Sequence, residues 1–281
     1  SFMFACISIM IVDLHCHTNI SDGALSPDQL ISLAVTKGVD MLSITDHDTL
    51  GAYAEITSIP TEMQLICGIE ISSQWRGQGI HIVGLNVDME NNDLNDTILQ
   101  LSQIRIQRAE KIAYRLGRLG FANCMEGAAA LATNQIGRPH FAQYLANIGA
   151  VKDTSEAFKK YLGAGKLGDV KEHWPNIEMS IKLIRQAGGI AVLAHPSKYK
   201  MTRSKLTSLI SDFRDSKGQA IEVVSGLQIP SVTRDLAKLS RQFNLLASCG
   251  SDFHSPEKSW ASLGKTSHLP DMCQPVWSQW R

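Results

Sequence analysis

Short apolar runs recur along the chain and alternate with stretches of helical periodicity. The runs cover residues 9–14, 41–45, 64–69, 80–85, 189–194, 220–224 and 245–250. Continuous apolar runs separated by helical patterns are typical of parallel strands that are buried on both faces. They predict an α/β fold in which strands and helices alternate. A chain of 281 residues could arrange these elements as one barrel or as two domains.

Helix signals fill the gaps between several of these runs. Ser26 offers an N-cap, followed by Pro27 at the first helical position and by Gln29 three residues after the cap. Further helices are predicted over residues 176–187, 204–216 and 231–243. The middle of the chain has no strand pattern, only helical stretches at residues 95–119, 125–132, 139–147 and 155–162. We therefore predict a barrel from residues 1–92 and 175–281, interrupted by a helical insertion domain at residues 93–174.

Charge and composition narrow the class of protein. Lysine and arginine total 27, as do aspartate and glutamate, so no overall field attracts nucleic acid and a polyanion must bind at a local patch. The six cysteines show no paired spacing, which predicts reduced thiols and a cytoplasmic location. Residues 2–12 are apolar but lack a basic start and are too short to cross a bilayer. We expect no signal peptide, no membrane association and no obligate protein partner.

The tail beyond residue 254 contains Trp260, Trp277 and Trp280. Since large aromatic side chains are mostly found in contact with a core, we expect this segment to pack back on the barrel.

Side chains that can bind metal occur at the ends of the apolar runs. His15 and His17 are two residues apart at the end of a predicted strand, where both side chains point to one face and can hold one ion. For a single His-X-His, two unrelated histidines in a turn would be the simpler explanation, but the pattern repeats. Nine such residues lie at predicted strand ends or in adjoining loops: His15, His17, Asp22, His47, Glu70, His81, His195, Asp252 and His254. His173 and His268 fall outside it and are expected on the surface.

Nine candidate ligands are more than one ion requires. A single ion takes about four to six ligands, and a two-metal site takes about six to eight protein groups, so this set suggests three ions. Imidazoles and carboxylates without a thiolate suit manganese, iron or zinc and exclude a site for magnesium alone. In βα barrels the chemistry lies where strands end, so these residues are predicted to converge at one mouth.

Together, these segments resemble the polymerase-and-histidinol-phosphatase (PHP) family, a branch of the amidohydrolase superfamily. The resemblance rests on His15-Cys16-His17 with Asp22, Thr45-Asp46-His47-Asp48, Gly68-Ile69-Glu70, His81, His195-Pro196 and Gly250-Ser251-Asp252-Phe253-His254. It covers nearly the whole chain. It implies a distorted seven-stranded (β/α)7 barrel with a trinuclear metal site, in which manganese is the ion that the family favours.

The same resemblance implies roles for the nine residues. His15, His17, Glu70 and Asp252 would hold the first ion, Glu70, His81 and His195 the second, and Asp22, His47 and His254 the third. A metal-bridged water held by Glu70, Asp252 and His254 would attack phosphorus. Asp46 and Asp48 would support His47 from a second layer. Three divalent ions bring about six positive charges to three carboxylates, which favours a dianion such as a phosphate ester.

Three further residues are candidates for substrate contact. Pro139 places Arg138 and His140 at the start of a helix, where free amides favour anions. An ordinary capped helix with an exposed arginine is the alternative, and His140 could instead be a tenth ligand. Lys198, three residues after His195, is the third candidate. The helix before them carries a row of cations: Arg105, Arg108, Lys111, Arg115 and Arg118. We interpret this row as a solvated face in preference to a track that binds nucleic acid.

Within the family, the insertion and the segments at residues 84–86, 137–141 and 158–166 are most similar to the bacterial YciV or ribonuclease AM group. This resemblance implies a phosphoesterase that hydrolyses the 3′-phosphate of 3′,5′-bisphosphonucleotides and removes 5′ nucleotides from short 5′-phosphorylated RNA. The alternatives are a histidinol-phosphate type of small-metabolite phosphatase, which needs no basic insertion, and a non-catalytic PHP scaffold module.

Overall fold

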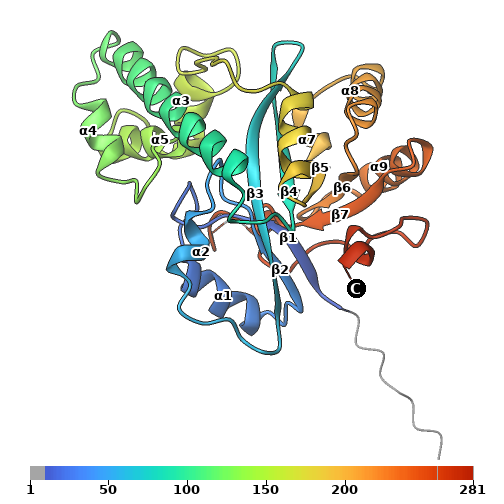
Figure 1. The fold of residues 1–281 in the computed structure, drawn as a ribbon. Coiled ribbons are helices and arrows are strands. Elements are labelled where there is room, and N and C mark those ends of the chain that lie inside the picture. Colours follow the sequence, from blue (N-terminus) through green and yellow to red (C-terminus); the bar gives the residue numbers. More distant parts are fainter. Residues whose placement is uncertain (1–9, 258, 281) are drawn as a thin grey trace, which may run out of the picture.

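The protein is an α/β barrel with a helical insertion, seen in a computed structural model that describes residues 10–257 and 259–280 (Figure 1). Seven strands follow one another around a single sheet in chain order. They are β1 (Val12–Cys16), β2 (Met41–Ile44), β3 (Gln64–Trp75), β4 (Gln78–Leu85), β5 (Ile190–Leu193), β6 (Ala220–Ser225) and β7 (Leu246–Gly250). All seven predicted runs are strands, so the predicted fold class is confirmed.

The two ends of the sheet meet and nearly close the barrel. Cys16, at the end of β1, forms a parallel bridge with Phe253, which follows β7. The amide of His17 donates to the carbonyl of Phe253 at 2.8 Å, and the amide of Asp252 donates to the carbonyl of His15 at 2.8 Å. The residues after β1 and after β7 are therefore fixed beside one another.

Strand β4 departs from the predicted parallel arrangement, because it runs antiparallel to both β3 and β5. It is joined to β3 by the two residues Arg76 and Gly77, whose φ angles are +47° and +74°. A two-residue turn of this kind closes a hairpin and leaves no room for a crossover. Because β4 is reversed, its first half lies at the mouth where its neighbours end, and His81 pairs with Ser72 there.

Helices cover the outside of the barrel where the sequence predicted them. Helix α1 (Pro27–Thr36) begins with the capping box of Ser26 and Gln29. The others are α7 (Ile177–Gln186), α8 (Arg203–Asp215) and α9 (Pro230–Gln242), each of which begins next to its predicted start. A short helix, α2 (Gly51–Glu55), was not predicted, because it is too brief to show a period.

The insertion between β4 and β5 consists of helices with a core of their own. They are α3 (Asn92–Gly117), α4 (Cys124–Ala129), α5 (Arg138–Asn147), α6 (Thr154–Ala157) and a π-helix at Phe158–Leu162. Helix α3 joins this unit to the barrel (Figure 1), since Leu94 and Leu101 pack in the barrel core. Farther along the same helix, Ile112 and Leu116 pack in the core of the insertion.

The tail packs on the barrel only in part. Trp277 is buried and Trp280 is partly buried against the barrel core, as expected. The expectation is wrong for Trp260, which is 63% exposed in the short 3-10 helix Ser259–Ala261 at the rim of the barrel. Within residues 10–257 and 259–280, no helix is both long and apolar enough to span a bilayer. The prediction for residues 2–9 lies outside the described residues.

Candidate metal centre

The nine candidate ligands lie together at one mouth of the barrel, and each offers an atom to a shared cluster. They form four overlapping groups whose ligand atoms lie within 4.8 Å of one another. The groups are His17, Asp22, His47 and His254; His15, Glu70 and His195; His15, His17 and Asp252; and His47, Glu70 and His81. Because His15, His17, His47 and Glu70 each belong to two groups, the site can hold several ions side by side.

Glu70 occupies the centre of this cluster. Its side chain is 1% exposed, at the level of the mouth where β3 continues into the hairpin with β4. The surrounding imidazole nitrogens are His81 Nδ1 at 2.9 Å, His195 Nε2 at 3.0 Å, His47 Nδ1 at 3.0 Å, His17 Nε2 at 3.3 Å and His15 Nε2 at 3.4 Å. The first two lie at Oε1 and the other three at Oε2. A carboxylate whose two oxygens face different sets of imidazoles can bridge two ions.

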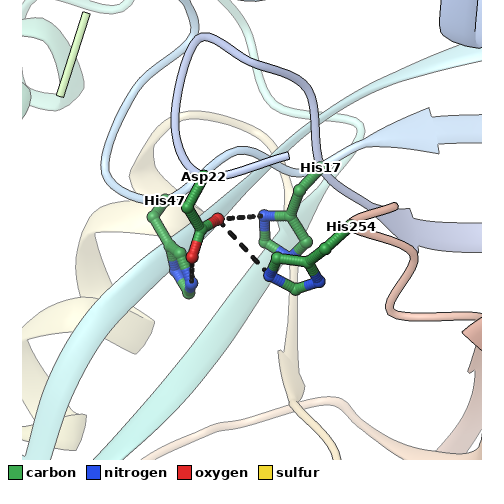
Figure 2. Close-up of side chains that lie close together, drawn as sticks. All are labelled: His17, Asp22, His47 and His254. Atoms are coloured by element: carbon green, nitrogen blue, oxygen red, sulfur yellow. Dashed lines mark ion pairs between the residues drawn. The ribbon is translucent and has the colours of Figure 1, made fainter. Parts of the chain in front are cut away.

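Asp22 anchors the group at the edge of the mouth (Figure 2). Its Oδ1 lies 3.3 Å from His254 Nε2 and 3.8 Å from His17 Nδ1, and its Oδ2 lies 3.8 Å from His47 Nε2. His17 also faces inward, with Nε2 3.3 Å from Asp252 Oδ1. His17 therefore lies between the group around Asp22 and the group around Asp252.

Burial and neighbouring charges strongly shift the pKa values of several side chains in the cluster. Burial alone would raise the pKa of Glu70, but the imidazoles of His81, His47 and His15 hold it well below its usual range. The pKa values of Asp22 and Asp252 are likewise held well below their usual range by nearby imidazoles, although burial opposes this. Burial lowers the pKa of His17, but Asp252 and Glu70 more than compensate and raise it to about 10. An ion that binds His17 must therefore displace a proton.

Several buried atoms of the cluster have no hydrogen-bond partner among the described residues. They are His15 Nε2, both ring nitrogens of His17, His47 Nδ1, Glu70 Oε2 and His195 Nδ1. Buried polar atoms are almost always hydrogen-bonded, so a concentration of unpaired ones requires an explanation. A metal ion accepts lone pairs from imidazole and carboxylate together, and the set of donors fits a borderline transition ion.

Glu222 is a member of this site that the sequence analysis missed. It lies within β6 and is 2% exposed, and its Oε2 accepts a hydrogen bond from the amide of His195 at 2.6 Å. The same oxygen lies 3.1 Å from His15 Nδ1. This contact places the His15 proton on Nδ1 and leaves Nε2 free to face the cluster. A lone glutamate inside the apolar run 220–224 was the available signal.

Replacing Glu222 by glutamine should weaken metal binding without unfolding the protein. Glutamine keeps the shape of the side chain but loses the charge that orients His15, and loss of such a partner lowers metal affinity by roughly 10- to 100-fold. Calorimetric titration with Mn²⁺ measures the effect, and Glu110→Gln on the exposed face of α3 is the matched control. Equal affinities for Glu222→Gln and the control would contradict the assignment.

Asp46 holds the loop that presents His17 and Asp22. Its carboxylate accepts hydrogen bonds from the amide of Thr18 at 2.8 Å, from the Thr18 hydroxyl at 2.5 Å and from the Ser21 hydroxyl at 2.6 Å. Asp46 lies outside the four groups of potential ligands. Its contacts fix the backbone between His17 and Asp22, so Asp46 supports these two potential ligands indirectly.

Asp48 connects the insertion to the strand that carries Glu70. It has a φ of +54°, and its Oδ1 accepts from the amide of Ser72 at 2.6 Å. Its Oδ2 accepts from Nε of Arg105 at 2.6 Å, and Arg105 also donates to the Ser72 hydroxyl at 3.0 Å. The ion pair is almost fully buried on the aspartate side. Helix α3 is thereby tied to the loop that follows His47.

The cations of α3 are not all on a solvated face, contrary to the sequence interpretation. Arg105 and Arg108 are half-buried, and Arg108 donates to the carbonyl of Val170 at 3.1 Å. Burial, together with the neighbouring Arg138 and Arg105, lowers the pKa of Arg108 to about 10. The segment that returns to the barrel packs along this part of the helix, which the periodicity of α3 alone could not reveal. Lys111, Arg115 and Arg118 are exposed, as predicted.

The three candidate substrate contacts lie at the edge of the cluster. Arg138 donates to the carbonyl of Leu162 at 3.1 Å, and its charge interacts with Asp169 and Asp22. His140 Nδ1 accepts a hydrogen bond from the amide of Gly137 at 2.9 Å, which caps α5. Lys198 Nζ donates to Asp252 Oδ2.

None of these three residues belongs to the groups of potential ligands found among the described residues. Because the hydrogen bond from the amide of Gly137 uses Nδ1 of His140, Nε2 is the ring nitrogen that remains for other contacts. Of the three, Lys198 is the residue with a direct contact to a potential ligand, Asp252.

Comparison with known proteins identifies the family. Residues 13–195 match the PHP domain, which is more than half of the chain. The chain belongs to the PHP family. It is 42% identical to the 5′-3′ exoribonuclease of Haemophilus influenzae, in an alignment that covers 95% of this chain and 98% of that protein. It is also 38% identical to the 3′,5′-nucleoside bisphosphate phosphatase of Chromobacterium violaceum, in an alignment that covers 95% of this chain and 95% of that protein.

A solved structure supports the same relationship within the PHP family. An amidohydrolase from Chromobacterium violaceum, determined with bound sulfate and no metal, superposes with a TM-score of 0.88 at 38% identity. The superposition covers 96% of this chain and 95% of that one. The barrel and its insertion are therefore shared with this relative in nearly their full extent.

Proposed function

We propose that this PHP-family chain is a metal-dependent phosphoesterase acting on nucleotides. It removes the 3′-phosphate of 3′,5′-bisphosphonucleotides and takes 5′ nucleotides from short RNA in the 5′-to-3′ direction. The observation that carries the proposal is the cluster of unpaired imidazole and carboxylate atoms around Glu70. The names of the two relatives, an exoribonuclease and a bisphosphate phosphatase, agree with one site serving both substrates.

The proposed ligands are the nine residues of the cluster, holding three divalent ions with manganese preferred over iron or zinc. By the family resemblance, His15, His17, Glu70 and Asp252 would hold one ion, Glu70, His81 and His195 a second, and Asp22, His47 and His254 a third. The ligand atoms also bring His15 together with Glu70 and His195, and His47 together with Glu70 and His81. When bound, these ions supply Lewis acidity toward the phosphoryl oxygens and activate a water. We propose that Glu70, Asp252 and His254 would hold this water.

The residues outside the cluster set the choice of phosphate ester. We propose that the guanidinium of Arg138, at the start of α5, binds the 5′-phosphate of the substrate, with His140 beside it. Lys198, which is paired with Asp252 in the structure, would neutralise charge on the 3′-phosphate ester. A substrate anchored by its 5′-phosphate presents the ester on O3′ to the cluster. Cleavage there releases phosphate from a bisphosphonucleotide and the first nucleotide from an RNA.

Two further proposals concern organisation and location. Residues 93–174 form a substrate-recognition domain inserted in the barrel of residues 1–92 and 175–281, a division that the separate core around Phe141 and Leu145 supports. The described cysteines are free thiols, which supports a reducing compartment such as the cytoplasm.

A paired substrate assay tests the proposed function. Purified protein loaded with Mn²⁺ is given 3′,5′-bisphosphoadenosine and, separately, histidinol phosphate. We expect adenosine 5′-monophosphate and inorganic phosphate from the first at a kcat/KM far above that for the second. Preference for histidinol phosphate would favour a small-metabolite phosphatase, and no turnover of any phosphoester would favour a non-catalytic module.

Arg138→Ala should weaken binding of substrates with a 5′-phosphate selectively. A charge-assisted contact to phosphate is worth about 1.5–3 kcal/mol, so KM for 3′,5′-bisphosphoadenosine should rise by roughly 10- to 150-fold. Turnover of p-nitrophenyl phosphate, which lacks a second phosphate, should change little. Arg118→Ala on the exposed end of α3 is the control. Equal losses on both substrates would remove Arg138 from substrate binding.

A further inference from the structure

Three large apolar side chains are exposed on two segments at the rim of the mouth. Leu227 and Ile229 follow β6 and are 48% and 68% exposed. Trp260, in the segment after β7, is 63% exposed. Single exposed apolar residues are common, but a tryptophan and two aliphatic side chains exposed on adjoining segments are a candidate binding surface.

The two segments are held together and are part of the mouth. The amide of Leu227 donates to the carbonyl of Trp260 at 2.9 Å, and the amide of Gly226 donates to the carbonyl of Gly250 at 2.8 Å. Gly226 has a φ of +59°, and a Cβ there would lie 2.6 Å from the Trp260 carbonyl oxygen and 3.1 Å from that of Ser251. Only glycine allows this close approach. The rim is therefore continuous with the backbone that leads into Asp252.

This rim and the proposed 5′-phosphate contact belong to different parts of the fold, because the rim follows β6 and β7 whereas Arg138 begins α5 of the insertion. Arg138 belongs to the insertion, where its Nη1 donates to the carbonyl of Leu162 at 3.1 Å and lies 3.6 Å from Asp169 Oδ1. Trp260 lies instead beside the ends of β6 and β7. Figure 1 shows these two strands on the other side of β3 and β4 from the insertion. A substrate anchored at Arg138 and cleaved at the cluster would continue toward the β6–β7 side.

We propose that Leu227, Ile229 and Trp260 form the subsite for the nucleobase on the 3′ side of the scissile phosphate. The inference rests on the proposed function, because only an RNA substrate has a base at this position. Every nucleobase has a π face that stacks on an aromatic ring without sequence preference, and the aliphatic side chains cover its edge. A bisphosphonucleotide ends at its 3′-phosphate and leaves this subsite empty. The rim therefore separates exonuclease activity from phosphatase activity at one shared cluster.

Kinetics on three substrates test the subsite. The substrates are 3′,5′-bisphosphoadenosine, the 5′-phosphorylated dinucleotide pApA, and a pApA analogue whose second ribose has no base. Stacking of usual strength corresponds to a roughly 5- to 150-fold change in kcat/KM. Trp260→Ala should lower kcat/KM for pApA by a factor in this range, and should leave the values for the other two substrates unchanged. Trp260→Phe should recover most of the loss, because an aromatic face is restored.

Matched variants and outcomes make the test decisive. Tyr114→Ala removes an aromatic side chain of similar exposure (68%) on α3 and should affect no substrate. If wild-type protein cleaves pApA and Trp260→Ala does so equally well, or if all three substrates suffer alike, the subsite is refuted while the proposed function stands. If the mass of the wild-type protein in light scattering is twice that of Trp260→Ala, the rim would be assigned to contact with a second copy of the chain and the inference would be overturned. Wild-type protein that cleaves neither nucleotide would refute the proposed function itself.

Discussion

Glu70→Gln should abolish turnover of 3′,5′-bisphosphoadenosine while leaving the fold intact. Both oxygens of Glu70 face imidazoles of the cluster, His81 and His195 on one side and His47 on the other. An amide presents one oxygen and one NH₂ group, so it cannot bridge two ions and it turns a donor toward them. Loss of the several kcal/mol that metal ions contribute to the transition state corresponds to a roughly 1000-fold or larger fall in kcat.

Metal content and activity should fall together in this variant. The measurement combines kcat with metal analysis by mass spectrometry on the same preparation, and circular dichroism checks the fold. Glu62→Gln, in the exposed loop before β3, is the control and should keep both metal and activity. A Glu70→Gln protein that retained full metal content and wild-type kcat would exclude Glu70 as a bridge.

Removal of metal should also abolish activity and lower the thermal stability of the protein. Without ions, the unpaired ring nitrogens of His15 and His17 remain buried, at a cost in free energy of unfolding. An ion present at a hundred times its Kd adds about 2.7 kcal/mol to that free energy. For a chain of this size, with an unfolding entropy of about 2.1 cal/mol/K per residue, this corresponds to a rise in Tm of roughly 5 °C per ion.

Differential scanning calorimetry before and after chelation measures the change in stability. We expect Tm to fall on treatment with a chelator and to return, together with activity, when Mn²⁺ is added back. A matched experiment with Ca²⁺, which prefers oxygen ligands, should restore neither, because imidazoles dominate the cluster. Full activity and an unchanged Tm in metal-free protein would contradict the account.

The sequence was sufficient to predict the barrel and the cluster of potential ligands. Parallel strands buried on both faces produce unbroken apolar runs, and the carboxyl ends of such strands meet at one mouth. His15, His195 and Asp252 could therefore be assigned to one place although they are far apart in the chain. The capping box at Ser26 likewise identified the start of α1, because its hydrogen bonds are local.

Features that depend on tertiary contacts escaped sequence reasoning. The direction of β4 follows from the two-residue turn at Arg76 and Gly77, which an apolar run does not encode. Glu222 resembles an isolated charge in a strand until His15 is seen beside it. Arg105 has the periodicity of an exposed helical position, and its burial against Asp48 depends on how the insertion docks on the barrel. Periodicity reports one face of an element, and these contacts join different elements.

Anomalous X-ray diffraction at the manganese edge, on crystals grown with Mn²⁺, tests the central claim most directly. We expect three peaks at the barrel mouth, two of them on either side of the Glu70 carboxylate and the third beside Asp22. Each peak should lie within coordination distance, about 2.0–2.3 Å, of imidazole nitrogens and carboxylate oxygens of the nine residues. A mouth without anomalous peaks, or peaks coordinated by other residues, would contradict the proposal that this cluster is a trinuclear phosphoesterase centre.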